Sequence, residues 1–121
     1  MRLVVVGAAT GWHAVRLAAE AGRRGHDVAV EEWPRLGATI DPAALSSQER
    51  FLPPSLDAAD VVAVRSMPAG RLEEVILRMD VLGRLAARGT PVVNAPRALE
   101  TAIDKYLSLA RLAAAGLPVP R

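Results

Sequence analysis

Residues 2–13, RLVVVGAATGWH, join an apolar run to a glycine-containing turn and the start of a helix. The run from Leu3 to Val6 is apolar throughout, which is typical of a strand covered on both faces. Gly7 and Gly11 let the backbone turn, and an amphipathic pattern follows. Its apolar positions are three and four apart, at Ala14, Leu17, Ala18 and Ala21. A strand that leads into a helix in this way predicts an α/β fold on a parallel sheet.

The same alternation continues along the chain. Apolar runs at residues 28–30, 61–64 and 92–93 predict further strands. Helical patterns over residues 72–86 and 106–113 each end at a glycine, as helices commonly do. Right-handed crossovers between parallel strands place helices on both faces of the sheet. We therefore expect a single Rossmann-like α/β domain over residues 1–121, with a parallel sheet of about four strands.

Residues 33–56 fit this alternation poorly. In TIDPAALSSQERF, residues 39–51, Asp41 is a good helix cap and Pro42 suits a first helical turn. We therefore predict a short helix there. The next residues, LPPSL at 52–56, are predicted to form a loop.

Composition excludes several classes of protein. Aromatic residues make up only 3% of the chain and its 13 acids are interleaved with the basic residues, so a nucleic-acid surface is not expected. Cysteine is absent, which excludes disulfides and thiolate metal sites. No apolar run reaches the roughly 18 residues of a membrane span, and the first strand leaves no room for a signal peptide before it. We expect a cytoplasmic protein that binds neither membranes nor nucleic acid.

Ligands of open α/β sheets bind beyond the carboxyl ends of the strands, and this rule points to the segments GAATGWH, RSMPAGR and NAPRA. In the first, Gly11 either serves a tight turn or lets the backbone approach a ligand. Glu31 lies 20 residues after Gly11, like the ribose-binding acid of dinucleotide folds, but the third glycine of that motif is missing. Trp12 and His13 are large residues for a helix start, and His13 is either a ligand contact or a partly exposed cap.

Arg65 follows an apolar strand, where an unpaired buried charge would be costly. Its partner is either an internal acid such as Asp60 or a bound carboxylate or phosphate. The spacing of His13 and His26 does not suit a metal site, and the chain has no Gly-x-Ser-x-Gly motif. No catalytic residue and no metal ligand are predicted.

The segment VVNAPRALETAIDKYLSLARLAAAGLPVPR, residues 92–121, resembles the RimK-like glutamate ligases of the ATP-grasp superfamily. In that family an Asn-x-Pro segment and a short helix lead to Asp-Lys, which begins a helix that ends in Gly-φ-Pro-x-Pro. Residues 11–13, GWH, and residues 65–85, RSMPAGRLEEVILRMDVLGRL, are also similar to a branch of the family. The resemblance covers nearly the whole chain and implies an N-terminal pre-ATP-grasp domain.

The resemblance assigns a role to Lys105, the one lysine among the 15 basic residues. In the family the lysine of this pair approaches the nucleotide phosphates, and a compact ammonium suits that role. The alternative is a surface lysine paired with Asp104 or Glu100. The family's first-domain loops help bind the acceptor, which nominates as substrate-binding residues Gly11, Trp12, His13, Arg65 and Ser66.

The resemblance also implies what the chain lacks. In the complete ligase, ATP and Mg²⁺ convert a carboxylate to an acyl phosphate, which an amine displaces, and the family's remaining nucleotide and magnesium contacts lie downstream of Gly-Leu-Pro-x-Pro. We expect the chain to stop at this domain border and to be inactive alone, because phosphoryl transfer needs metal and several converging cations. The expected partners are a small-molecule acceptor, the missing ATP-grasp domain or a partner chain, and a second copy in a homo-oligomer. A stand-alone Rossmann-like module that binds a nucleotide or sugar nucleotide is the alternative.

Overall fold

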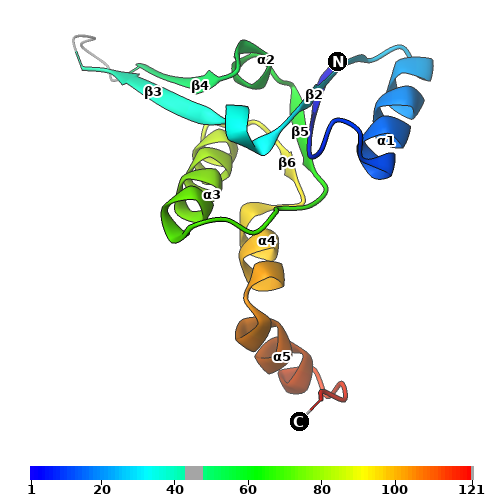
Figure 1. Ribbon diagram of the computed structural model, residues 1–121, viewed down its shortest axis with the longest axis vertical. Helices are drawn as coiled ribbons and strands as arrows, with labels where there is room; N and C mark the ends of the chain where they lie inside the picture. Colours follow the sequence, from blue (N-terminus) through cyan, green and yellow to red (C-terminus); the bar gives the residue numbers. More distant parts are fainter. Residues whose placement is uncertain (43–47, 121) are drawn as a thin grey trace.

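The computed structural model describes residues 1–42 and 48–120. In this part of the chain a parallel sheet of four strands has the order β2-β1-β5-β6 (Figure 1). Its strands are β1 (Arg2–Val6), β2 (Asp27–Glu31), β5 (Val61–Val64) and β6 (Val92–Val93). The predicted α/β class and the parallel sheet of about four strands are confirmed.

Two long helices cover opposite faces of the sheet. Helix α1 (Trp12–Arg23) connects β1 to β2, and α3 (Leu72–Ala87) connects β5 to β6 (Figure 1). These two connections leave the central β1–β5 pair in opposite directions, so crossovers of the same hand put the helices on different faces. The β1/β5 boundary is therefore the switch point of the sheet, where α/β proteins form ligand crevices.

The main core lies on the α3 face. Val4 and Val6 of β1 pack in one cluster with Leu82 and Leu85 of α3, whereas Val5 is buried outside that cluster. This alternation follows from the two-residue repeat of a strand. Each of these fully buried leucines contributes about 1.5–3 kcal/mol through burial, so α3 is a principal source of stability.

The short helix predicted within residues 39–51 is wrong at the two described ends of that segment. Asp41 is instead the last residue of β3 (Gly37–Asp41), which pairs antiparallel with β4 (Gln48–Leu52). The rest of that predicted helix, residues 43–47, lies outside the described residues. Phe51 explains the difference, because its ring is buried in the core and a strand places it there. This tertiary contact outweighs a local capping signal.

The loop predicted at residues 52–56 is also wrong in part, because a single helical turn, α2 (Pro54–Asp57), begins there. Pro54 suits the first helical position, and Leu56 anchors the turn in the core. The Asp57 carboxylate accepts hydrogen bonds from the Phe51 backbone N–H at 3.1 Å and from Arg88 Nη1 at 2.7 Å. The Arg88 bond and then the Phe51 bond hold the pKa of Asp57 below its ordinary value.

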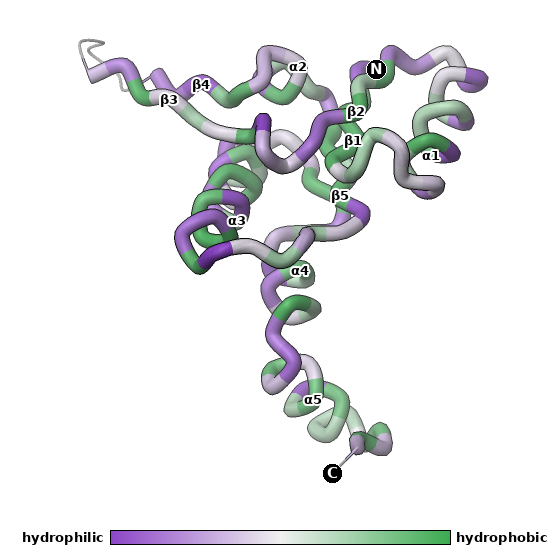
Figure 2. Tube along the Cα trace, in the orientation of Figure 1, coloured by the Kyte–Doolittle hydropathy of each residue, from purple (hydrophilic) through white to green (hydrophobic). Residues whose placement is uncertain are grey.

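The C-terminal helices extend away from the sheet. Helix α4 (Pro96–Ile103) buries Leu99 against the core, whereas α5 (Lys105–Ala114) buries no residue. Figure 1 shows α5 projecting from the rest of the molecule, and Figure 2 shows apolar residues recurring along it. We call residues 105–120 the arm and the rest of the described chain the globule. No helix of residues 1–42 or 48–120 is long and apolar enough to cross a membrane.

Candidate functional site

The loop after β1 is a tight turn. The Gly11 N–H donates to the Ala8 carbonyl at 2.8 Å, and a Cβ on Gly11 would lie 3.0 Å from that oxygen. The Ala9 N–H donates to Glu32 Oε1 at 3.1 Å, which holds the loop against the end of β2. This geometry explains Gly11 by the turn alone. A ligand contact at Gly11 stays a prediction.

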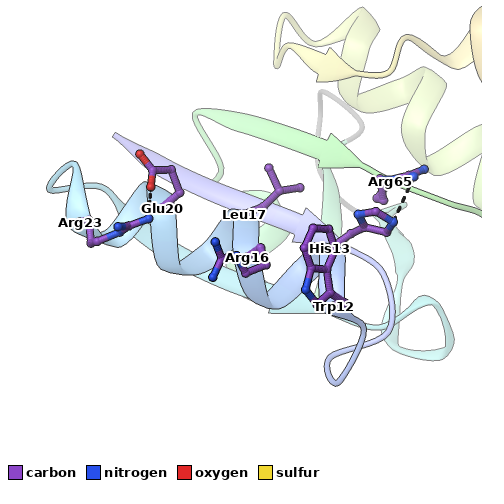
Figure 3. Close-up of a pocket in the computed structure, with 7 residues that line it drawn as sticks. All are labelled: Trp12, His13, Arg16, Leu17, Glu20, Arg23 and Arg65. Atoms are coloured by element: carbon purple, nitrogen blue, oxygen red, sulfur yellow. Dashed lines mark hydrogen bonds and ion pairs between the residues drawn. The ribbon is translucent and has the colours of Figure 1, made fainter.

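Trp12 and His13 both point outward at the start of α1. The Trp12 side chain is 69% exposed, and its ring meets the His13 ring edge-on with centroids 4.9 Å apart. His13 Nε2 lies 3.3 Å from Arg65 Nη2, at the end of β5 (Figure 3). The structure thus brings together three residues that were nominated on loops following two different strands.

The internal acid named for Arg65 is not its partner. Asp60 instead accepts a hydrogen bond from the Arg2 backbone N–H at 2.6 Å. The Arg65 side chain is exposed, and within residues 1–42 and 48–120 it forms no ion pair. Its exposure removes the cost of a buried charge, but leaves its donors available to a ligand.

These side chains open onto a cavity of about 390 Å³ between α1 and the end of β5, which we call the α1 cavity. Its lining residues are Trp12, His13, Arg16, Leu17, Glu20, Arg23 and Arg65 (Figure 3). The Glu20 carboxylate accepts hydrogen bonds from Arg23 Nη2 and, at 2.8 Å, from Arg24 Nε, so its charge is already paired. The sequence interpretation missed Arg16, although its position four residues after Trp12 places it on the same helix face.

A second cavity, of about 420 Å³, lies between the end of β5 and α4, and we call it the α4 cavity. It is lined by Arg65, Ser66, Met67, Asn94, Ala98, Leu99, Ala102 and Ile103. The Ser66 carbonyl accepts a hydrogen bond from Trp33 Nε1 at 2.8 Å, and Asn94 Nδ2 donates to the Val64 carbonyl at 3.1 Å. Arg65 lines both cavities, whereas Ser66 lines only the second. Four of the five nominated acceptor residues are therefore divided between two cavities, and Gly11 lines neither.

Lys105, at the first position of α5, lines neither cavity, although Ile103, two residues before it, lines the α4 cavity. Asp104 caps that helix, because its Oδ1 accepts from the Leu107 backbone N–H at 2.9 Å. Among the residues that the structure describes, Lys105 pairs with neither Asp104 nor Glu100, and its side chain is exposed. The eight residues of α4, about 12 Å of helix, intervene between the end of the sheet and this lysine (Figure 1). The structure does not bring Lys105 to the acceptor candidates.

Glu31 is engaged within the fold. Its side chain is buried, with Ser55 Oγ donating to Oε1 at 2.6 Å and Arg35 Nη1 lying 3.3 Å from Oε2. A ribose-binding acid would have to face the loop after β1, and these contacts commit Glu31 elsewhere. Within the described ranges no three carboxylate, histidine or cysteine side chains converge as a metal ion would require.

Comparison with known proteins gives one clear sequence relative and several related structures. No family model matches the chain. The chain is 39% identical to the tetrahydromethanopterin:alpha-L-glutamate ligase of Methanosarcina acetivorans over 94 residues. This matched segment covers 78% of the chain and 28% of that ligase. A glutamate ligase is thus similar to this chain over most of the chain's length. The resemblance to glutamate ligases noted in the sequence is thereby confirmed.

Solved structures of the ATP-grasp ligase PsnB agree. The complex with a minimal precursor is 28% identical, with a TM-score of 0.67, and the match covers 99% of this chain and 45% of PsnB. A complex with the precursor peptide PsnA2 and AMPPNP gives 28% identity, a TM-score of 0.64, and the same coverage, 99% and 45%. Over nearly its whole length the chain is thus similar to an ATP-grasp ligase, and it spans less than half of each of these relatives.

Proposed function

We propose that this chain is the N-terminal, acceptor-binding portion of an ATP-dependent carboxylate–amine ligase that transfers glutamate, and that it does not catalyse ligation by itself. The observation that carries the proposal is the 39% identity to a glutamate ligase over 78% of the chain. The same match spans only 28% of that ligase. We assign the catalytic ATP-grasp domain to the part of the relatives that this chain does not match.

The acceptor side of the proposal rests on the switch point of the sheet. Loops after β1 and β5 place Trp12, His13 and Arg65 around the α1 cavity, where α/β proteins bind ligands. Ser66 extends the same surface into the α4 cavity. A small-molecule acceptor that presents its reacting group from this surface would face the catalytic domain across the carboxyl edge of the sheet.

The nucleotide side rests on Lys105. An exposed ammonium without an ion-pair partner among the described residues is available to the phosphates of ATP. One lysine is insufficient for phosphoryl transfer, which needs metal and several positive groups around the phosphates. No described cluster of side chains suits Mg²⁺, so we assign ATP and Mg²⁺ to the complete enzyme. Solved PsnB complexes contain Mg and ADP.

A chimera tests the proposal. The segment of the Methanosarcina acetivorans ligase that matches this chain is replaced by residues 1–121, and ADP release is measured with ATP, Mg²⁺, glutamate and tetrahydromethanopterin. We expect glutamate-dependent ADP release from the chimera and none from the chain alone. A ligated product formed by the chain alone would contradict the proposal. So would a chimera that folds and binds ATP but shows no turnover while the parent ligase is active.

A further inference from the structure

We propose that the α1 cavity binds a ligand in which an anionic group, a carboxylate or a phosphate, is attached to a flat apolar ring. The anion is held by Arg65, the ring lies against Trp12, and Arg16 adds positive charge further along α1 (Figure 3). The identification of this ligand as the recognised part of the acceptor rests on the proposed function. The binding itself does not require ligase activity.

The charge of the cavity favours an anion. Arg65 Nη2 lies 3.3 Å from His13 Nε2, and a guanidinium can only donate hydrogen bonds. A histidine ring carries no negative charge, so this neighbour leaves the charge of Arg65 uncompensated. Within the described part of the chain the other donors of the Arg65 side chain meet no carboxylate. A planar carboxylate or a phosphate can accept two of them at once.

Arg16 reinforces this preference from α1. Its side chain is exposed and has no ion-pair partner in residues 1–42 or 48–120, although Glu20 follows it by one helical turn. Glu20 is instead bound by Arg23 and Arg24. The one carboxylate that lines the cavity is therefore neutralised, and two guanidinium groups remain unpaired around it. Their positive charge attracts an anion into the cavity.

The apolar part of the cavity favours a ring. Trp12 exposes a large aromatic surface that no element of the described chain covers, and Leu17 adds apolar surface one turn further along α1. Aromatic rings stack readily on tryptophan. A volume of about 390 Å³ is within the range of small-molecule sites and suits one ring with its substituent.

Titration of the full chain with three probes tests the inference. Benzoate, phenyl phosphate and the neutral benzamide are added separately, and the indole N–H of Trp12 is followed by NMR. We expect both anions to shift this signal in a saturable manner and benzamide to bind at least tenfold more weakly. The tighter of the two anions identifies the acceptor group as a carboxylate or as a phosphate.

Variants locate the site. Arg65→Ala should weaken both anions at least tenfold, Arg65→Lys should retain part of the affinity, and Arg16→Ala should weaken binding severalfold. Arg111→Ala, an exposed arginine of the arm, is the matched control and should change nothing. If Arg65→Ala fails to fold, as judged by the amide signals of the sheet, Arg65→Lys and Arg16→Ala carry the comparison.

Equal binding of benzoate and benzamide, or an Arg65→Ala affinity equal to that of Arg111→Ala, would overturn the inference. The titration uses neither ATP nor the catalytic domain. An inactive chimera with intact anion binding therefore refutes the proposed function alone. An active chimera with no anion binding refutes this inference alone.

Discussion

Helices α3 and α5 show how the same local pattern leads to two different environments. Both are amphipathic and both end at a glycine with positive φ, Gly89 at 96° and Gly116 at 74°. Yet α3 buries three residues, Leu82 among them, and α5 buries none. Tyr106 of α5 is 82% exposed. A helix forms from local signals, but its apolar face is buried only where the chain offers a facing surface.

This difference separates the two functions proposed for the chain. The globule has a packed core and carries the α1 cavity at its switch point. The arm carries Lys105 on a helix that packs mainly against α4. Under our proposal the acceptor side is thus organised within this chain, whereas the nucleotide side requires the surface assigned to the catalytic domain.

The largest expected effect is on stability. Leu82→Ala in α3 should lower the free energy of unfolding by about 2–5 kcal/mol, because the side chain is fully buried and a cavity remains. Leu112→Ala, the matched change in α5, should cost under about 0.5 kcal/mol, because Leu112 is 42% exposed. Urea unfolding followed by circular dichroism measures both. Equal losses would show that the arm is packed as firmly as the globule.

Self-association should depend on the arm. We expect the chain to form dimers or larger oligomers at high concentration, because α5 exposes apolar side chains that Leu109 and Leu112 exemplify. Replacing both by glutamate should shift the light-scattering mass toward the monomer without lowering the unfolding midpoint. Ile40→Glu, an exposed apolar position in β3, is the control. A wild-type chain that stays monomeric at high concentration would refute the homo-oligomer prediction.

A smaller effect should come from the polar contacts of Asp57 in the globule. Its pKa is lowered in the folded state, so its contribution is present above the unfolded pKa and is lost as pH falls through the folded pKa. Asp57→Asn should cost about 1 kcal/mol at pH 7, since the side chain is partly exposed to solvent. The difference in the free energy of unfolding between the wild-type chain and Asp57→Asn should disappear in acid. A gap that persists at pH 2 would mean that the charge of Asp57 does not matter.

The smallest global effect should come from the cap of α5. Asp104→Ala removes the acceptor of the Leu107 N–H and should accelerate amide exchange in the first turns of the arm. The free energy of global unfolding should change by less than about 0.5 kcal/mol, because α5 contributes little to the core. Asp104→Asn, which keeps an acceptor oxygen, is the control. Accelerated exchange across the whole sheet would contradict the separation of arm and globule.

The predictable parts of the fold are those fixed by neighbours in sequence. Residues 61–64 form a strand as predicted, because a run of apolar residues suits a covered strand whatever surrounds it. The hairpin was missed because Phe51 is drawn into the core by residues far away in sequence. The local capping signal at Asp41 is too weak to outweigh that contact.

The candidate site divides in the same way. The rule that ligands bind at strand ends pointed to the loops that carry Trp12, His13 and Arg65, and the sheet topology brings those loops together. The placement of Ser66 in the neighbouring cavity depends on side-chain directions that topology does not specify. Arg16 was missed because an arginine on a helix resembles any solvated charge until its neighbours are known.

The most direct test measures both regions in the chimera with the archaeal ligase. Lys105→Ala should raise the KM for ATP at least tenfold and leave the KM for the acceptor unchanged, because the arm serves the nucleotide. Arg65→Ala should raise the KM for the acceptor and leave the KM for ATP unchanged, because we assign the acceptor to the α1 cavity. If Lys105→Ala leaves the KM and kcat for ATP unchanged, or if both variants alter the same constant, the division of roles between arm and globule is contradicted.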